Sequence, residues 1–288
     1  MRFICAVCAG IFSWLVVTPV SAQVEVQFSQ QRSLYLQYES IDLTLELTNV
    51  TDAPFSLSVN DDGKSWLGFL VFNQASGVVN QVKSITAKQI NLAPGETKRI
   101  SVDILPYYAI RATGGYTAQA IVHIPGLKPI MTGKLYFTVG KGETIWTQDV
   151  YNTGVKRVYS LVRFLDVNEA NLYLRVEEPD QNLMYNTVRL GKVVSFADPQ
   201  IAFDRTGNLH IVQVISAKNY RYTEADANGG ILAQEDRQSI AGVMTPTLAR
   251  SDHGMVQFIG GLTKKDATER AKLSETQTIP LSASGVAR

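Results

Sequence analysis

The chain has 288 residues with 27 basic and 26 acidic side chains, so its formal net charge at pH 7 is only +1. This balance excludes the basic field that attracts nucleic acid or anionic lipid. The length predicts two domains or one large β domain. Short alternating runs rich in β-branched and aromatic residues, without long stretches of helical periodicity, predict an all-β fold.

The N-terminus has the three-part pattern of a secretory signal peptide. Arg2 supplies a positive start, residues 3–17 form an apolar run, and small residues precede a cleavage site between Ala22 and Gln23. The run is shorter than the roughly 20 apolar residues that a membrane span prefers, and no later run is long enough. We therefore expect residues 1–22 to be removed and the protein to be exported to the periplasm or the extracellular space of a bacterium.

Signal removal would take away both cysteines, Cys5 and Cys8. The mature chain would then have no disulfides in an oxidising compartment. Its hydrophobic cores must hold the fold without covalent links.

Residues 23–139 predict a β-sandwich domain. Ile41, Leu43, Leu45 and Leu47 alternate with polar residues, as in a strand with one buried and one solvated face. Further alternating runs are separated by turn signals at the spacing of sandwich proteins. On residues 92–104 and 107–122 the segment resembles the Ig-like modules of bacterial surface and periplasmic proteins. The resemblance implies a corner tyrosine at Tyr116, but it names no function because such modules serve many.

Residues 140–146 predict a linker, and residues 147–281 a domain of β repeats. Segments starting at Asn171 and Asn208 align without a gap at an offset of 37 residues, which pairs Tyr185 with Tyr222. A weaker third copy starts at Pro246. A period near 40 residues with short strands is typical of propeller blades, so we expect about three four-stranded units. In the middle unit the strands are expected over residues 199–203, 209–214, 219–225 and 229–236.

The turn between the first two strands of the middle unit is expected at residues 204–208. There Gly207 can take a positive φ, and Asp204 can accept hydrogen bonds from backbone amides. The pattern from Pro199 to His210 resembles repeats of secreted bacterial propellers, including sialidase-like enzymes, over about residues 158–281.

Three units are fewer than the four to eight blades of closed propellers. A second copy could complete a ring, the units could form an open stack, or repeated hairpins could build another β fold. The sequence leaves these alternatives open. Self-association through the repeats would cover their open edges.

The sequence indicates no catalytic residue, no metal ligand and no cofactor. The arginines of the repeats form no assignable sialidase cluster, and Glu177 and Glu178 are expected on opposite faces of a strand. The histidines show no metal-binding spacing and no clustering with carboxylates, so His210 is interpreted as a scaffold residue.

Aromatic residues are the remaining candidates for binding or for packing between repeats. Tyr185 aligns with Tyr222 one repeat later, and a tyrosine that recurs at the same repeat position favours packing between repeats. The candidates are Trp146, Tyr173, Tyr185, Tyr220 and Tyr222.

These observations predict an exported, non-enzymatic binding or scaffold protein that recognises a protein or a glycan. One alternative is a glycan-acting, sialidase-like hydrolase or its degenerate relative. Another is a structural subunit of an envelope complex. Residues 282–288 are expected to be a disordered tail.

Export and cleavage make a direct prediction. When the full chain is produced in a bacterium with a secretion system, the mature protein should begin at Gln23, because Ala22 provides the small residue that signal peptidase requires. Mass spectrometry of the exported protein measures this. An intact Met1, or a product retained in the cytoplasm, would contradict it.

Overall fold

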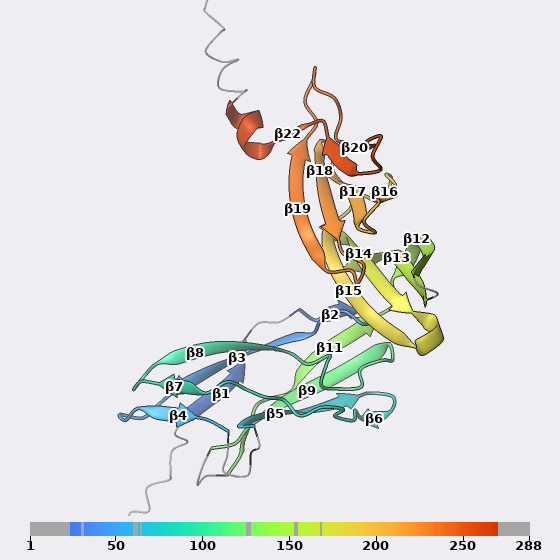
Figure 1. The fold of residues 1–288 in the computed structure, drawn as a ribbon. Helices are drawn as coiled ribbons and strands as arrows, with labels where there is room; N and C mark the ends of the chain where they lie inside the picture. The colour runs from blue at the N-terminus through green and yellow to red at the C-terminus, as the bar shows by residue number, and fades with distance from the viewer. Residues whose placement is uncertain are drawn as a thin grey trace, which may run out of the picture.

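The computed structural model describes residues 24–29, 32–59, 63, 65–124, 128–152, 155–167 and 169–269. Strands dominate this part of the chain (Figure 1), which confirms the all-β class. The predicted cleavage site at Ala22 and Gln23 and the predicted tail over 282–288 lie outside the described residues. We call the strands up to Gly140 the N-terminal unit, and those from Glu143 on the C-terminal unit.

The N-terminal unit is built from two main sheets, whose strands pair antiparallel except for β2. One has the order β1-β3-β8, and the other has the order β2-β11-β9-β5-β6, in which β2 runs parallel to β11. The strands are β1 (Val24–Phe28), β2 (Leu34–Leu36), β3 (Asp42–Asn49), β4 (Phe55–Leu57), β5 (Leu67–Asn73), β6 (Gly77–Val78), β7 (Ile90–Leu92), β8 (Thr97–Asp103), β9 (Gly114–Val122), β10 (Ile130–Met131) and β11 (Leu135–Gly140).

Both sheets contribute to one hydrophobic core. Leu43, Leu45 and Leu47 on β3 are completely buried, as their alternation predicts. Tyr116 and Val122 on β9 belong to the same core from the other sheet. Burial of each such side chain stabilises the fold by about 1.5–3 kcal/mol relative to leaving it exposed.

The C-terminal unit consists of small antiparallel meanders in a propeller-like arrangement (Figure 1). One sheet has the order β12-β13-β14-β15, the next has the order β16-β17-β18-β19-β22, and β20 pairs with β21. The strands are β12 (Glu143–Asn152), β13 (Val155–Asp166), β14 (Glu169–Glu178), β15 (Leu183–Lys192), β16 (Gln200–Phe203), β17 (Leu209–Ser216), β18 (Asn219–Ala225), β19 (Ile231–Gln238), β20 (Thr247–Arg250), β21 (Val256–Ile259) and β22 (Leu262–Thr263); the short 3₁₀ helix η1 (Pro179–Gln181) joins β14 to β15.

The sequence repeat coincides with repeated hairpins. The 37-residue offset maps the β14–β15 hairpin onto the β17–β18 hairpin, and the four strands predicted for the middle unit match β16 to β19 within two residues at each end. The third copy contributes the β20–β21 hairpin within the described residues. Its predicted second half lies largely beyond residue 269.

Five of the seven residues predicted as a linker lie in strands. β11 ends at Gly140 and β12 begins at Glu143, so only Lys141 and Gly142 lie between strands. A Cβ atom on Gly142 would lie 2.4 Å from Cγ1 of Val162, so the chain passes too close to β13 for any larger residue. The two units therefore meet through a short, tightly packed connection.

Strand β14, in the first sheet of the C-terminal unit, is buried on both faces. On β14, Leu172 and Leu174 point into a core shared with β16 and β17. The intervening Tyr173 points the other way, into a small core with Leu36 of the N-terminal unit. Alternate side chains of one strand thus pack against two different neighbours, which explains its nearly continuous burial.

Polar contacts accompany that small core, and we call the group of Arg32, Glu39, Asp166 and Tyr173 the junction. Arg32 donates to both carboxylate oxygens of Glu39. The Tyr173 hydroxyl donates to Glu39 Oε1 at 3.1 Å, and Arg32 Nε lies 3.4 Å from Asp166 Oδ2. Burial and the Glu39 charge raise the pKa of Tyr173 to about 12, so its hydroxyl stays protonated and able to donate.

The two-sided burial of β14 makes a prediction about stability. Leu172→Ala should lower the free energy of unfolding by about 2–5 kcal/mol, because it removes a completely buried side chain from the core between the two sheets. Leu165→Ala, on the neighbouring strand but 66% exposed, is the matched control and should change it by less than about 0.5 kcal/mol. Urea titrations followed by circular dichroism measure both, and equal effects would contradict the assigned core.

Candidate functional site

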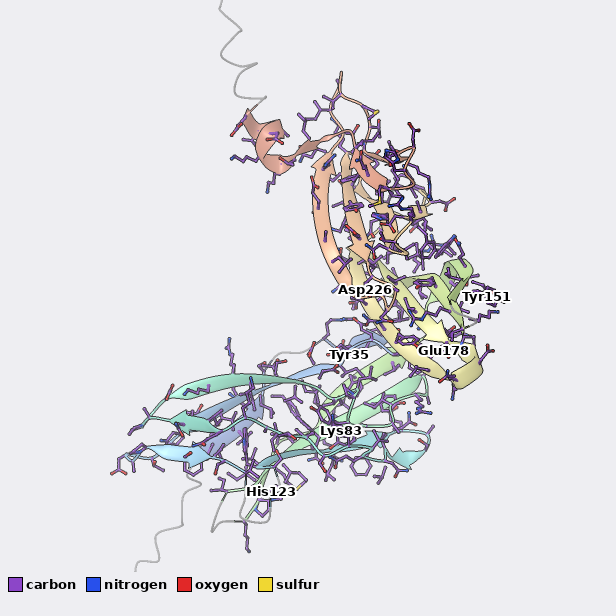
Figure 2. The ribbon with its side chains drawn as sticks, viewed as in Figure 1. Tyr35, Lys83, His123, Tyr151, Glu178 and Asp226 are labelled. Atoms are coloured by element: carbon purple, nitrogen blue, oxygen red, sulfur yellow. The ribbon has the colours of Figure 1, made fainter. Side chains whose placement is uncertain are left out.

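A cleft of about 840 Å³ lies where the two units meet. The N-terminal unit contributes the turn after β2 and the segment 103–111 after β8, and the C-terminal unit contributes the end of β14, η1 and the start of β15. Figure 2 shows Glu178 at the end of the C-terminal unit that faces the N-terminal unit. Ligand sites commonly have volumes of roughly 300–1,000 Å³, so the cleft has the size of a binding site.

The wall from the C-terminal unit is held by polar contacts of Tyr185. Its hydroxyl donates to Glu178 Oε2 at 2.8 Å, and the guanidinium of Arg157 lies 4.5 Å from the centre of its ring. A β-bulge at Tyr185 interrupts the pairing of β14 with β15, and bulges commonly redirect a side chain next to a functional site. Glu178 is buried, while its neighbour Glu177, which also lines the cleft, is partly exposed.

The wall from the N-terminal unit includes a strained residue. Tyr38 has a φ of 69°, a left-handed conformation that a bulky side chain adopts only when its surroundings impose it. Here Arg175 of β14 donates to the carbonyl of Gln37 at 2.8 Å, and its guanidinium lies 5.5 Å from the Tyr38 ring. Burial lowers the pKa of Arg175. The turn that borders the cleft is therefore held by the opposite unit.

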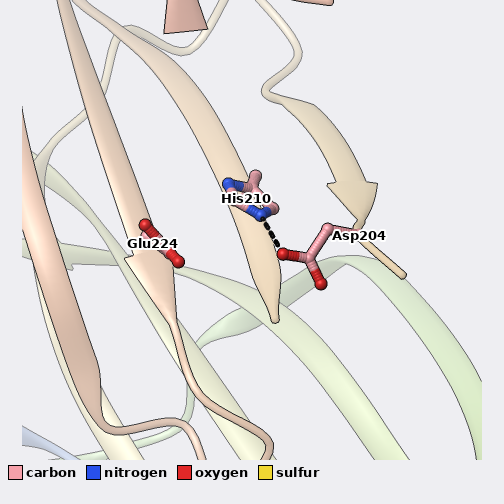
Figure 3. A group of neighbouring side chains, drawn as sticks. All are labelled: Asp204, His210 and Glu224. Carbon is pink, nitrogen blue, oxygen red and sulfur yellow. Dashed lines mark hydrogen bonds and ion pairs between the residues drawn. The ribbon is translucent and has the colours of Figure 1, made fainter. Parts of the chain in front are cut away.

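A second group of polar side chains lies in the sheet β16–β19, and it shows that one prediction from the sequence was wrong. No clustering of histidine with carboxylates was expected, yet Asp204, His210 and Glu224 converge (Figure 3), with one ligand atom from each within 4.8 Å of the others. His210 and Asp204 are buried, and Nε2 of the histidine lies 3.2 Å from Asp204 Oδ2. The signal was missed because His210 and Glu224 are neighbours only across the β17–β18 pairing.

Protein groups satisfy this cluster. Asp204 Oδ1 accepts hydrogen bonds from the backbone amides of Thr206 and Asn208, as its predicted turn role requires. Nδ1 of His210 lies 2.8 Å from the hydroxyl of Tyr222. Glu224 accepts from Asn208 at 3.0 Å and from Tyr222 at 3.3 Å. A metal ion would have to displace these bonds, so the cluster has the properties of a structural network.

The candidate aromatics occupy different places. Tyr185 lines the cleft, and Tyr173 is completely buried at the junction. Trp146 packs against the core between the first two sheets of the C-terminal unit. Tyr222 stacks on Phe258 of the third copy, with ring centres 5.0 Å apart, and Tyr220 is half-buried on β18. The structure therefore places only Tyr185 of this set at the cleft.

Comparison with known proteins assigns the chain to no family. No family model matches it, and no curated protein sequence is similar enough to count as a relative. Among the residues that the structure describes, no helix has the length and apolar character needed to cross a membrane.

The network predicts acid sensitivity. Burial opposes the charged form of Asp204, but hydrogen bonds from Thr206, His210 and Asn208 outweigh it and hold the pKa of Asp204 below its usual range. The resulting stabilisation is present above the unfolded-state pKa of about 3.9 and is lost as the pH falls through the lower folded-state value.

The test compares two substitutions. Asp204→Asn should lower the melting temperature at neutral pH and reduce its further fall between about pH 6 and about pH 3. Asp252→Asn, at an exposed position in the turn between β20 and β21, should leave both quantities unchanged. Thermal melts across that pH range measure this, and parallel curves for wild type and Asp204→Asn would refute the assigned role.

Proposed function

We propose that this is an exported, non-enzymatic binding protein whose ligand occupies the cleft between its two units. The main support for this proposal is a cleft of binding-site size that residues of both units line. The two units meet through buried contacts. A cleft that is already formed needs little reordering when a ligand binds, and this preorganisation favours affinity.

The cleft offers the mixture of groups that binding sites use. Tyr38 and Tyr185 supply aromatic surface with polar tips, and the remaining lining includes both apolar and charged side chains. Tyr108 supports the wall from within the core, because it is buried and its hydroxyl donates to the carbonyl of Phe69 at 2.6 Å and accepts from the Phe69 amide at 3.2 Å. Rigid aromatic side chains give contact area at a low cost in conformational entropy.

An Ig-like assignment of the N-terminal unit belongs to this proposal. Two sheets share one core, and the hydroxyl of Tyr116 donates to the carbonyl of Ala112 at 2.6 Å. A tyrosine that bonds back to the backbone a few residues upstream supports the corner expected of such modules. Export to the periplasm or beyond rests on the signal-peptide pattern of residues 1–22. Cleavage of that segment would also remove both cysteines, Cys5 and Cys8.

The enzymatic alternative receives less support from the arginines of the C-terminal unit. A sialidase-like site gathers several guanidinium groups around one carboxylate. Here five of these arginines bond to separate partners: Arg157 to Ala227, Arg163 to Glu143, Arg175 to Gln37, Arg189 to Asn171 and Arg221 to Asp236. Hydrolysis of any glycan or peptide on a substrate panel, abolished by one point substitution, would overturn the non-enzymatic part of the proposal.

A blocking substitution tests the cleft. Ser40→Trp places a large side chain at an exposed position of the cleft wall, so it should weaken ligand binding by at least about tenfold, or 1.4 kcal/mol. Peptide and glycan arrays identify the ligand, and calorimetric titration measures the change. Ser76→Trp, exposed in the turn before β6, is the control for the added tryptophan. Equal binding by both variants and the wild type would remove the cleft as the ligand site.

A further inference from the structure

The sheet that contains β5, β9 and β11 has an apolar outer face. Along β5, Phe69 and Val71 are buried in the core of the N-terminal unit. Leu70 and Phe72 alternate with them, so they point to the opposite, outer face, where they are partly exposed. A continuous apolar run is typical of a strand that is covered on both faces. The sequence of β5 therefore indicates a second covering layer on the outer side of this sheet.

The pairing of the strands gathers apolar side chains on this outer face. Phe72 is paired with Val78 of β6 on one side and with Thr117 of β9 on the other. Thr117 is paired in turn with Tyr136, so the four side chains form a row across β6, β5, β9 and β11. With the neighbouring pair on β9 and β10, the apolar side chains of the outer face are Leu70, Phe72, Val78, Ile121, Met131 and Tyr136.

This face is open over the described residues. Val78, Met131 and Tyr136 are 65%, 50% and 61% exposed. A Cβ atom on Gly68, which follows the same alternation as Leu70, would have no heavy atom within 4 Å, so no described side chain lies over that position. None of the residues that form β5, β6, β9, β10 and β11 is charged. The exposed Lys134 immediately precedes β11, as in interfaces that have an apolar centre and a polar rim.

The other main sheet of the same unit has a solvated outer face. There Arg99 of β8 forms an ion pair with Glu46 of β3 at 2.7 Å, and the hydroxyl of Thr44 donates to that of Ser101 at 3.1 Å. Both sheets share one core, so burial in that core does not account for the difference between their outer faces. Uncharged faces of this kind mark interaction surfaces.

One end of the apolar face is already covered. Leu36 on β2 is paired with Gly140 at the end of β11, and its neighbour Tyr35 points into the core of the N-terminal unit. Leu36 points the other way and packs with Phe164 and Tyr173 of the C-terminal unit. The open part of the face, over β11, β9, β5 and β6, therefore continues an existing contact between sheets.

We propose that a second copy of this chain covers the open part of this face, with the two sheets packed face to face about a twofold axis. A twofold axis brings the same surface of both copies together. Because these strands carry no charge, the contact places no like charges opposite each other. An anionic membrane or a charged partner would gain no electrostatic attraction from the same strands. The inference does not depend on the cleft.

The area of the face predicts a weak dimer. About four strand widths of roughly 4.8 Å and about seven residues of roughly 3.3 Å give a face of roughly 450 Å². Two copies would bury about twice this area, which is below the roughly 1,200 Å² at which standard interfaces begin. We therefore expect the dimer to form and dissociate with protein concentration.

Sedimentation velocity of the mature full chain, over about a hundredfold range of concentration, tests the dimer. The wild type should shift from monomer to dimer as the concentration rises. Tyr136→Lys should weaken dimerisation at least about tenfold, because it buries an unpaired charge in the contact. Tyr151→Lys makes the same substitution at a residue of β12 that is 70% exposed, and should leave dimerisation unchanged.

A second variant tests whether the whole row takes part. Val78→Lys, at the opposite end of the row from Tyr136, should weaken dimerisation to a similar extent. Thermal melts check that the variants stay folded, as their exposure predicts. Loss of the dimer in only one of the two variants would confine the contact to one strand and overturn face-to-face packing.

The remaining outcomes decide against the inference in distinct ways. A monomer at every concentration would overturn it, and so would a dimer that persists in Tyr136→Lys, because that dimer uses another surface such as the repeats. Binding of the wild type to phosphatidylcholine vesicles, abolished by Tyr136→Lys, would assign the face to lipid instead. Ser40→Trp, which blocks the cleft, should leave dimerisation unchanged, so this inference and the proposed function fail separately.

Discussion

Strand β14 packs alternate side chains into two different cores, and the arrangement of the whole protein depends on this. Leu172 and Leu174 hold the second sheet of the C-terminal unit against one face, while Tyr173 holds β2 of the N-terminal unit against the other. A strand can do this only because successive side chains point to opposite faces. The N-terminal unit therefore covers a sheet face that would otherwise expose apolar surface to water.

The junction makes this contact directional. Apolar packing alone has little preference for orientation, whereas Glu39 has to meet both Arg32 and the Tyr173 hydroxyl within the small core. Removing one partner from such a group would leave a buried charge uncompensated, which is costly. The same docking brings Arg175 to the turn at Tyr38, so the wall of the cleft follows from the way the units are joined.

The two polar groups of the protein differ in what they leave available. At Asp204, His210 and Glu224 the hydrogen-bonding capacity is used by the turn, by Tyr222 and by Asn208, which suits a network that secures one hairpin. At the cleft, side chains of both units line an open volume, among them the partly exposed Tyr38, Glu177 and Tyr185. Satisfied polar groups stabilise a fold, whereas open groups beside a cavity can bind a ligand.

The sequence by itself determined the features that depend on residues close along the chain. The alternation on β3, the hairpins of the repeat and the turn roles of Asp204 and Gly207 follow from a side-chain period of two and from local hydrogen bonds. Only the tertiary structure decided the cleft, the convergence of His210 with Glu224, and the burial of Tyr173 against Glu39, which lies 134 residues away along the chain. Such contacts depend on which faces dock and in which register, and no local pattern records the position of a distant partner.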